Sequence, residues 1–162
     1  MQKIIYAIVH HTAVSRTKNP DQWNATNEYH REKWDMRSQL GYYVGYNYEI
    51  SASGTVRQAR LIGEETVACT GHNFDSIHIC LDGNFDIELP TKEQEKTLQD
   101  LLLRLVDEYK INWKDIVPHR MFANKSCYGN LLPDDWAQKI YLQGKISWLR
   151  RLIARLTGRA VI

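Results

Sequence analysis

The sequence predicts a three-layer α/β domain, in which a mixed β-sheet lies between helices. Three observations predict it: apolar, β-branched runs typical of strands come early, helical patterns alternate with them, and 162 residues suit about one domain. We expect this domain to cover residues 1–143. Residues 144–162 are expected to form a separate basic amphipathic helix, with Gly144 as the one candidate linker.

The strands are predicted from apolar runs bounded by turn residues. KIIYAIVHHT at residues 3–12 is typical of a buried strand. Residues 41–51 and 55–63 flank the turn residues 51–54, which indicates a hairpin. SIHICLDG at residues 76–83 indicates a further strand, in which Cys80 is expected to be a small core residue.

Three helices are predicted before residue 144. In residues 19–36, Asn19 is expected to cap the first helix, with Pro20 in its first turn. Thr91 and Gln94 form a capping box for a second helix, whose leucines recur at helical spacing (Leu98, Leu101, Leu102 and Leu105). Residues 132–143 predict a shorter third helix.

Composition excludes several protein classes. The chain is 43% hydrophobic and 25% charged, which is typical of a globular domain and excludes a disordered one. It has neither a run of about 18 apolar residues nor a small-residue cleavage site after its first strand, so we expect no membrane span, no signal peptide and synthesis in the cytoplasm. Three cysteines are an odd set that does not suit a disulfide framework.

Positive charge is concentrated at the C-terminal end. Five of the 21 basic residues and none of the 19 acidic ones lie in residues 145–162, which leaves residues 1–144 at −3 (Lys145, Arg150, Arg151, Arg155 and Arg159). Apolar side chains recur there at helical spacing (Ile146, Leu149, Ile153 and Leu156, widened by Trp148 and Leu152). Two interpretations stay open: the helix contacts an anionic membrane, or its stripe docks on this domain or on a second copy.

A histidine and a cysteine lie close together in VPHRMFANKSCYGN, residues 117–130. His119 and Cys127 are eight positions apart, which does not suit one helical face, so we predict a loop whose ends converge. Histidine and cysteine are zinc ligands, and a third could come from the first strand, which ends in His10 and His11. Adjacent strand residues face opposite sides, so only one of the two can join such a site; a surface role is the alternative.

Four motifs in order resemble the zinc-dependent N-acetylmuramoyl-L-alanine amidases, which include small phage enzymes and peptidoglycan-recognition proteins. They are VHHTAV, GYNYEI, GHNFDSIHICLDG and HRMFANKSC, and the resemblance covers roughly residues 3–143. It implies the amidase fold and a zinc site made by His10, His119 and Cys127. It also implies catalytic roles for Tyr46 and Lys125, and it makes His72 a candidate substrate contact.

Three protein ligands leave one position on zinc for water, as in catalytic sites, whereas structural zinc is closed by a fourth ligand. In the alternative, His11 or His72 is a fourth ligand and the zinc is structural, without catalytic activity. Lys125 offers a positive charge for an oxyanion, and Tyr46 a hydrogen-bond donor or proton relay. His78 and His30 are expected to be surface histidines.

Two features depart from the family pattern. Tyr128 stands where the family commonly has proline after the ligand cysteine, which is expected to loosen the backbone, and the loop after His72 is shorter. The function expected is cleavage of the bond between N-acetylmuramic acid and L-alanine in peptidoglycan by a monomeric phage or prophage endolysin, with no nucleic-acid partner. A cytoplasmic amidase that recycles wall fragments is one alternative. A recognition module without catalysis is another, against which Cys127 argues.

Overall fold

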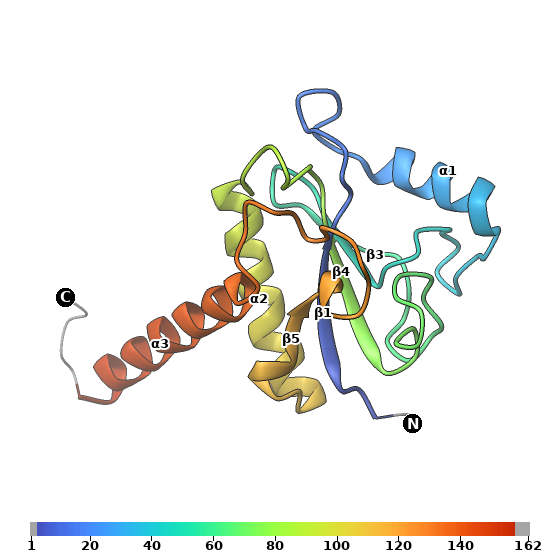
Figure 1. The fold of residues 1–162 in the computed structure, drawn as a ribbon. Helices are drawn as coiled ribbons and strands as arrows, with labels where there is room; N and C mark the ends of the chain where they lie inside the picture. Colours follow the sequence, from blue (N-terminus) through green and yellow to red (C-terminus); the bar gives the residue numbers. More distant parts are fainter. Residues whose placement is uncertain (1–2, 158–162) are drawn as a thin grey trace.

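One five-stranded sheet with helices on both sides forms the domain (Figure 1), and the computed structural model describes residues 3–157. The predicted three-layer α/β class is confirmed. In chain order the elements are β1 (Tyr6–His11), α1 (Trp23–Trp34), β2 (Tyr48–Ile50), β3 (Val56–Gln58), β4 (Ser76–Leu81), α2 (Lys92–Tyr109), the 3₁₀ helix η1 (Trp113–Asp115), β5 (Ile116–Pro118), the 3₁₀ helix η2 (His119–Met121) and α3 (Trp136–Thr157).

The strand order is β3-β2-β4-β1-β5, in which only the β2–β3 hairpin is antiparallel. In the central strands His10 pairs with Cys80, and on the other side of β1 Val9 pairs with Pro118. The carboxyl ends of β1 and β5 therefore meet at the same edge of the sheet. This edge is where ligands bind in open parallel sheets.

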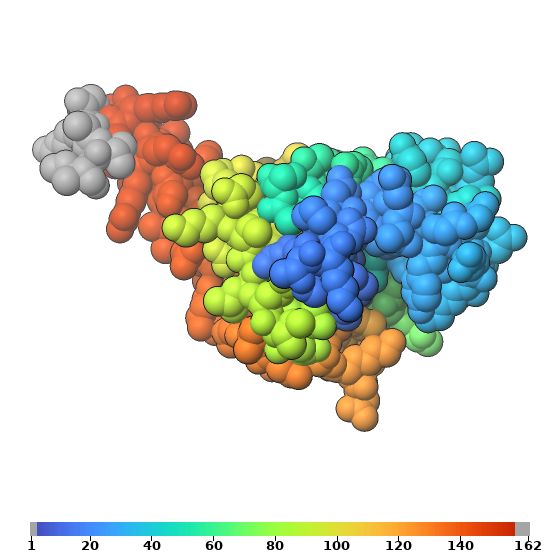
Figure 2. All heavy atoms as spheres, turned by 90° about the horizontal axis from the view of Figure 1, so that it is seen from above, coloured from blue at the N-terminus to red at the C-terminus, as the bar shows by residue number. Residues whose placement is uncertain are grey.

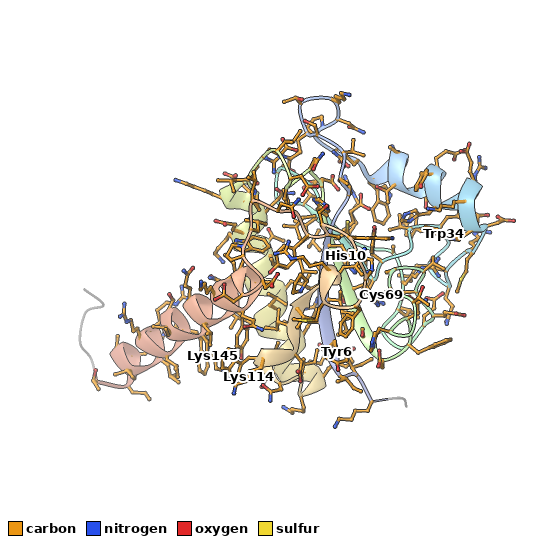
Figure 3. The ribbon with its side chains drawn as sticks, in the orientation of Figure 1. Tyr6, His10, Trp34, Cys69, Lys114 and Lys145 are labelled. Atoms are coloured by element: carbon orange, nitrogen blue, oxygen red, sulfur yellow. The ribbon has the colours of Figure 1, made fainter. Side chains whose placement is uncertain are left out.

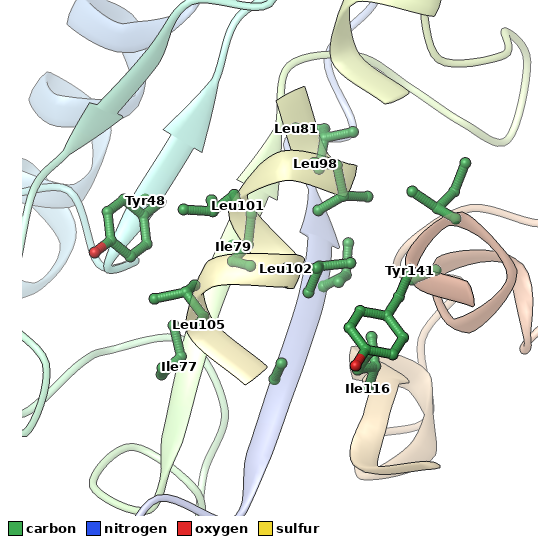
Figure 4. Packing of buried hydrophobic residues seen from close by; sticks show 14 of the residues in the cluster. Tyr48, Ile77, Ile79, Leu81, Leu98, Leu101, Leu102, Leu105, Ile116 and Tyr141 are labelled. Atoms are coloured by element: carbon green, nitrogen blue, oxygen red, sulfur yellow. The ribbon is translucent and has the colours of Figure 1, made fainter. Parts of the chain in front are cut away.

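The main core lies between the sheet and α2 and α3. β4 contributes Ile77, Ile79 and Leu81 to it, opposite the leucines of α2 (Figure 4). Because strand residues alternate, His78 and Cys80 face the other side of the sheet. The capping box that starts α2 is confirmed, since Thr91 Oγ1 accepts from the Gln94 amide at 3.0 Å and Gln94 Oε1 accepts from the Thr91 amide at 3.1 Å.

On the other side of the sheet lies α1, which begins later than predicted (Figure 1). Its N-cap residue is Gln22, so the prediction of Asn19 as the cap is wrong. The backbone N–H of Gln22 instead donates to the Asp82 carboxylate at 2.7 Å, which anchors the start of the helix to the end of β4. The prediction of His30 as a surface residue is also wrong: it is 5% exposed, and its ring accepts a hydrogen bond from the Gly45 amide.

Helix α3 runs without a break from Trp136 to Thr157. Gly144 is buried inside it, where a Cβ atom would lie 2.5 Å from the side chain of Gln99 on α2. Glycine is therefore needed for close helix packing, and the prediction of a linker there is wrong. The boundary predicted after residue 143 falls within this helix. Among the described helices, none is long and apolar enough to span a bilayer.

Candidate metal centre and its groove

Three predicted ligands meet at the carboxyl edge of the sheet. The donor atoms of His10, His119 and Cys127 all lie within 4.8 Å of one another, and Cys127 Sγ is 3.8 Å from His10 Nδ1. His10 ends β1, His119 follows β5 directly, and Cys127 lies in the loop after η2. The pairing of β1 with β5 thus brings the two histidines together, with ring centroids 4.6 Å apart.

His10 and His11 point to opposite sides of the sheet, as strand alternation predicts. His11 Nδ1 accepts a hydrogen bond from the Phe85 amide at 3.0 Å, so its side chain is engaged away from the three donors. Burial lowers the pKa of His11 to about 4, which keeps the ring neutral as an acceptor. Within residues 3–157 the group of donors has three members, and His11 does not supply a fourth.

The orientation of His10 is fixed by a residue that sequence reasoning placed at the surface. His78 is fully buried, because β4 is a central strand covered on both faces. Its Nε2 lies 3.0 Å from the His72 carbonyl, and its Nδ1 lies 3.0 Å from His10 Nε2. A carbonyl can only accept, so His78 donates from Nε2 and accepts from His10 at Nδ1. This leaves the lone pair of His10 Nδ1 directed toward the group that includes Cys127.

Arg120 holds the loop that carries Cys127. Its backbone amide donates to the Cys127 carbonyl at 2.7 Å. Its guanidinium spans four further acceptors, the carbonyls of Ser126, Gly129 and Leu132 and the carboxylate of Asp134. A single planar guanidinium group therefore holds the loop of residues 126–134 in place. Nothing in the sequence pattern identified this residue, because its partners are mostly backbone groups.

Tyr128 anchors the same loop, where a looser backbone was predicted. Its side chain is fully buried and its hydroxyl donates toward the carbonyls of Pro133 at 3.0 Å and Asp134 at 2.7 Å. The peptide bond between Cys127 and Tyr128 is cis. Gly129 follows with a φ of +107°, and a Cβ atom there would overlap the backbone of Phe85, so only glycine fits.

A cavity of about 1070 Å³ opens above the three donors. The carboxyl end of β1 forms its floor, α1 one wall, and residues 67–70 and 122–127 the others. His10 lies at the centre of the molecule, and Trp34 and Cys69, which also line the cavity, lie toward its α1 side (Figure 3). The cavity is large enough for a ligand of several sugar or amino-acid units.

Tyr46 and Lys125 line this cavity beside the donor group. The Tyr46 ring lies 5.1 Å from the His10 ring, and burial, followed by the nearby Cys80 and Cys127 groups, holds the pKa of Tyr46 well above its usual value. Tyr46 is therefore a protonated donor at neutral pH. Lys125 is exposed, and its charge is close enough to lower the pKa of His119, which burial chiefly brings to about 4.

His30 supports Tyr46 from α1. Its Nδ1 accepts from the Gly45 amide at 2.8 Å, and its ring lies 5.4 Å from that of Tyr46. Asn27, one helical turn earlier, accepts from the Tyr43 amide at 2.7 Å. These two bonds tie residues 43–46 to the helix that forms the cavity wall.

His72 lies apart from the cavity lining. Its ring packs on Phe122 with centroids 4.1 Å apart, and its Nδ1 lies 3.2 Å from both carboxylate oxygens of Asp75. Its backbone carbonyl, rather than its ring, takes part in the site through His78. Substrate contact by the His72 side chain stays a prediction.

The family model for N-acetylmuramoyl-L-alanine amidase matches residues 1–130, which contain the three donors, Tyr46 and Lys125. The chain belongs to this amidase family. A comparison with curated proteins finds no match.

Solved structures show the same fold for this amidase domain. The endolysin amidase LysCS from Clostridium intestinale is 23% identical with a TM-score of 0.70, over 88% of this chain and 84% of that one. Drosophila peptidoglycan recognition protein SD is 20% identical with a TM-score of 0.68, over 82% and 78%. A mutant of Drosophila PGRP-LB in complex with tracheal cytotoxin is 20% identical with a TM-score of 0.67, over 82% and 79%.

The three donors of the amidase fit a metal ion. Tetrahedral zinc with two nitrogen ligands and one sulfur ligand separates the ligand atoms by about 3.3–3.6 Å, close to the 3.8 Å between Cys127 Sγ and His10 Nδ1. Burial and the neighbouring His78 lower the pKa of His10, and burial lowers that of His119, so both rings are neutral, as ligation requires. Burial raises the pKa of Cys127 to about 12, so the thiol must lose its proton to bind a metal.

Proposed function

We propose that this chain is a zinc-dependent amidase that hydrolyses the amide bond between the lactyl group of N-acetylmuramic acid and L-alanine in peptidoglycan. The observation that carries the proposal is the group of His10, His119 and Cys127 at the floor of the cavity. Its three members leave a coordination position for water, which favours a catalytic site over a structural one. Membership of the amidase family supports the same reaction.

The residues of the chain have distinct roles in this proposal. His10, His119 and Cys127 would hold zinc, which when bound supplies a Lewis acid and lowers the pKa of water. Tyr46, protonated and next to the His10 ring, would donate a hydrogen bond from its phenol to the bound substrate or water. Lys125 places a positive charge at the cavity, where it stabilises negative charge that develops on the substrate carbonyl oxygen. The wall formed by α1 orients the glycan or the peptide.

We infer a phage or prophage endolysin as the biological setting. The resemblance in fold to an endolysin amidase supports it. In this setting the protein is made in the host cytoplasm, acts as a monomer and reaches the wall after the membrane is breached. A muropeptide-recycling amidase would instead act on soluble fragments, so comparing rates on intact wall and on soluble muropeptides separates the two settings.

Hydrolysis and metal content test the proposal together. Purified protein is expected to hold about one zinc per chain and to release peptides with a free L-alanine amino group from isolated wall, detected by mass spectrometry. Cys127→Ser is expected to lose zinc and activity together, because a hydroxyl is a poor replacement for a soft thiolate ligand. Wall binding without zinc or product would identify a recognition module instead. Full activity and bound zinc in Cys127→Ser would refute the site.

A further inference from the structure

The outer half of α3 leaves a set of apolar side chains uncovered. This half, residues 145–157, stands out from the body of the domain (Figures 1 and 2). Six apolar side chains on it are between 39% and 78% exposed: Ile146, Trp148, Leu149, Leu152, Ile153 and Leu156. Docking of these side chains on their own domain, one half of the second interpretation from the sequence, is therefore not seen among the described residues.

The stripe proper consists of four of these side chains, Ile146, Leu149, Ile153 and Leu156, and it is not a continuation of the face by which α3 packs on the domain. That face consists of Ala137, Ile140, Tyr141 and Gly144. Steps of three and four residues continue this packing face to Trp148, Arg151 and Arg155, and Leu152 lies beside them. The stripe side chains lie on roughly the opposite side of the helix at 3.6 residues per turn. A flat surface can therefore cover the stripe without displacing the domain.

Cations accompany the stripe, and acids are missing from it. Residues 145–157 contain Lys145, Arg150, Arg151 and Arg155 and no aspartate or glutamate. Lys145 Nζ lies 5.0 Å from the ring centroid of Trp148, at the edge of the apolar surface. Arg159, the remaining basic residue of the predicted helix at residues 144–162, lies outside the described residues. This combination of a cationic flank, a tryptophan and an apolar face matches the surface of an anionic bilayer.

We propose that residues 145–157 of α3 form a membrane-interface helix that binds anionic lipid bilayers in the plane of the headgroups. The stripe centred on Leu149 and Ile153 enters the boundary between headgroups and acyl chains. Lys145 and Arg150 flank the stripe and reach the lipid phosphates directly. Arg151 and Arg155 lie on the opposite side of the helix, where their charges add to the attraction to the anionic surface. This binding is separate from the amidase site and does not depend on it.

A second copy of the chain is a poorer occupant of the same surface. A symmetric pair packed through the stripe would bring the flanking cations Lys145 and Arg150 of the two copies near one another, with no acid in residues 145–157 to offset them. Like charges that face each other destabilise such an interface. An anionic bilayer supplies the opposite charge.

Vesicle co-sedimentation of the full chain tests the proposal. We expect binding to vesicles of phosphatidylglycerol and phosphatidylethanolamine at low salt, weaker binding at high salt, and little binding to phosphatidylcholine vesicles. Ile153→Gln with Leu156→Gln should lower the partition coefficient at least 10-fold. The matched control is Ile87→Gln with Leu89→Gln, which changes two side chains 68% and 60% exposed outside α3 and should leave binding unchanged.

A second set of variants tests the charges. Replacing Arg150, Arg151 and Arg155 by glutamine should lower binding to the anionic vesicles roughly 100-fold, since each basic residue near such a surface contributes a factor of about five. Three exposed cations of α2, replaced in the same way, form the control and should have little effect (Lys92, Lys96 and Arg104). Negligible binding by the unaltered chain, equal loss in the controls, or a lipid-free dimer that the Ile153 and Leu156 changes dissociate would each overturn the proposal.

Discussion

His10 Nε2 donates a hydrogen bond to His78 Nδ1 across 3.0 Å, deep under the floor of the cavity. His78 is itself held by the carbonyl of His72 at 3.0 Å. The chain of bonds selects one tautomer of each ring and directs His10 Nδ1 toward Cys127. A donor group on one edge of the sheet thus depends on a neighbouring strand, β4, for its geometry.

His78→Ala is expected to weaken zinc binding 10- to 100-fold, because His10 loses the partner that fixes its tautomer and ring plane. Competition with a chelator of known affinity measures the change. The matched control is His72→Ala, which removes a ring but keeps the carbonyl that His78 uses, so its zinc affinity should stay within about threefold. Equal zinc affinity in the His78→Ala variant and the unaltered chain would contradict this role.

Zinc binding is expected to release about one proton per chain at pH 7. Burial raises the pKa of Cys127 to about 12, so the free thiol is protonated, whereas the lowered pKa values of His10 and His119 leave both rings already neutral. Zinc affinity should therefore rise close to 10-fold per pH unit near neutrality. Calorimetry in buffers of different ionisation enthalpy counts the protons. Release of none would mean that Cys127 is not a ligand.

Lys125→Ala and Tyr46→Phe are each expected to keep zinc and to lower kcat about 100-fold or more, because each removes a group that acts on the substrate and not on the metal. Zinc content and kcat on purified wall are measured on the same preparations. His10→Ala provides the contrast, since it should lose zinc as well as rate, and His11→Ala should be much milder. Unaltered kcat in the Lys125→Ala or Tyr46→Phe variant would show that the replaced residue has no catalytic role.

The sequence and its resemblance to the family predicted which three donors lie together, but not which residues hold them in place. The alternation of a strand was enough to separate His10 from His11, and the capping box of Thr91 fixed the start of α2. His78 was misplaced because alternation identifies which side of a strand a residue faces but not whether that side is covered. His30 was misplaced because its neighbours in α1 are polar, and only the fold brings the segment of Tyr46 against it.

The boundary predicted at Gly144 shows that local sequence also does not decide where a helix ends. An isolated glycine between two helical patterns has the same sequence signal whether it separates two helices or allows one helix to pack closely. The contact of Gly144 with Gln99 on α2, a residue distant from it along the chain, decides between the two possibilities. Such long-range contacts are not encoded in any local spacing.

The stability of the metal-free protein is expected to depend on pH through His30. Burial, and then the charges of Lys33 and Arg60, lowers the pKa of His30 to about 4 from the ordinary value of 6.5. The folded state therefore binds fewer protons than the unfolded state between these values. The stabilisation from the neutral ring is complete above pH 6.5 and is lost as the pH falls toward 4.

His30→Gln removes this titration, so the gap in unfolding free energy between the unaltered chain and the variant should narrow by at most about 3 kcal/mol from pH 7.5 to pH 4. Denaturant unfolding with chelator present in every sample measures the gap. Burial raises the pKa of Asp82 to about 6, which changes stability in the opposite direction, but this contribution is common to both proteins and cancels. Asn27→Ala is the matched control: it breaks the bond to the Tyr43 amide in the same contact without removing a titratable group, so its cost should be the same at every pH. A gap that stays constant for His30→Gln as well would show that His30 does not titrate differently in the folded and unfolded chain.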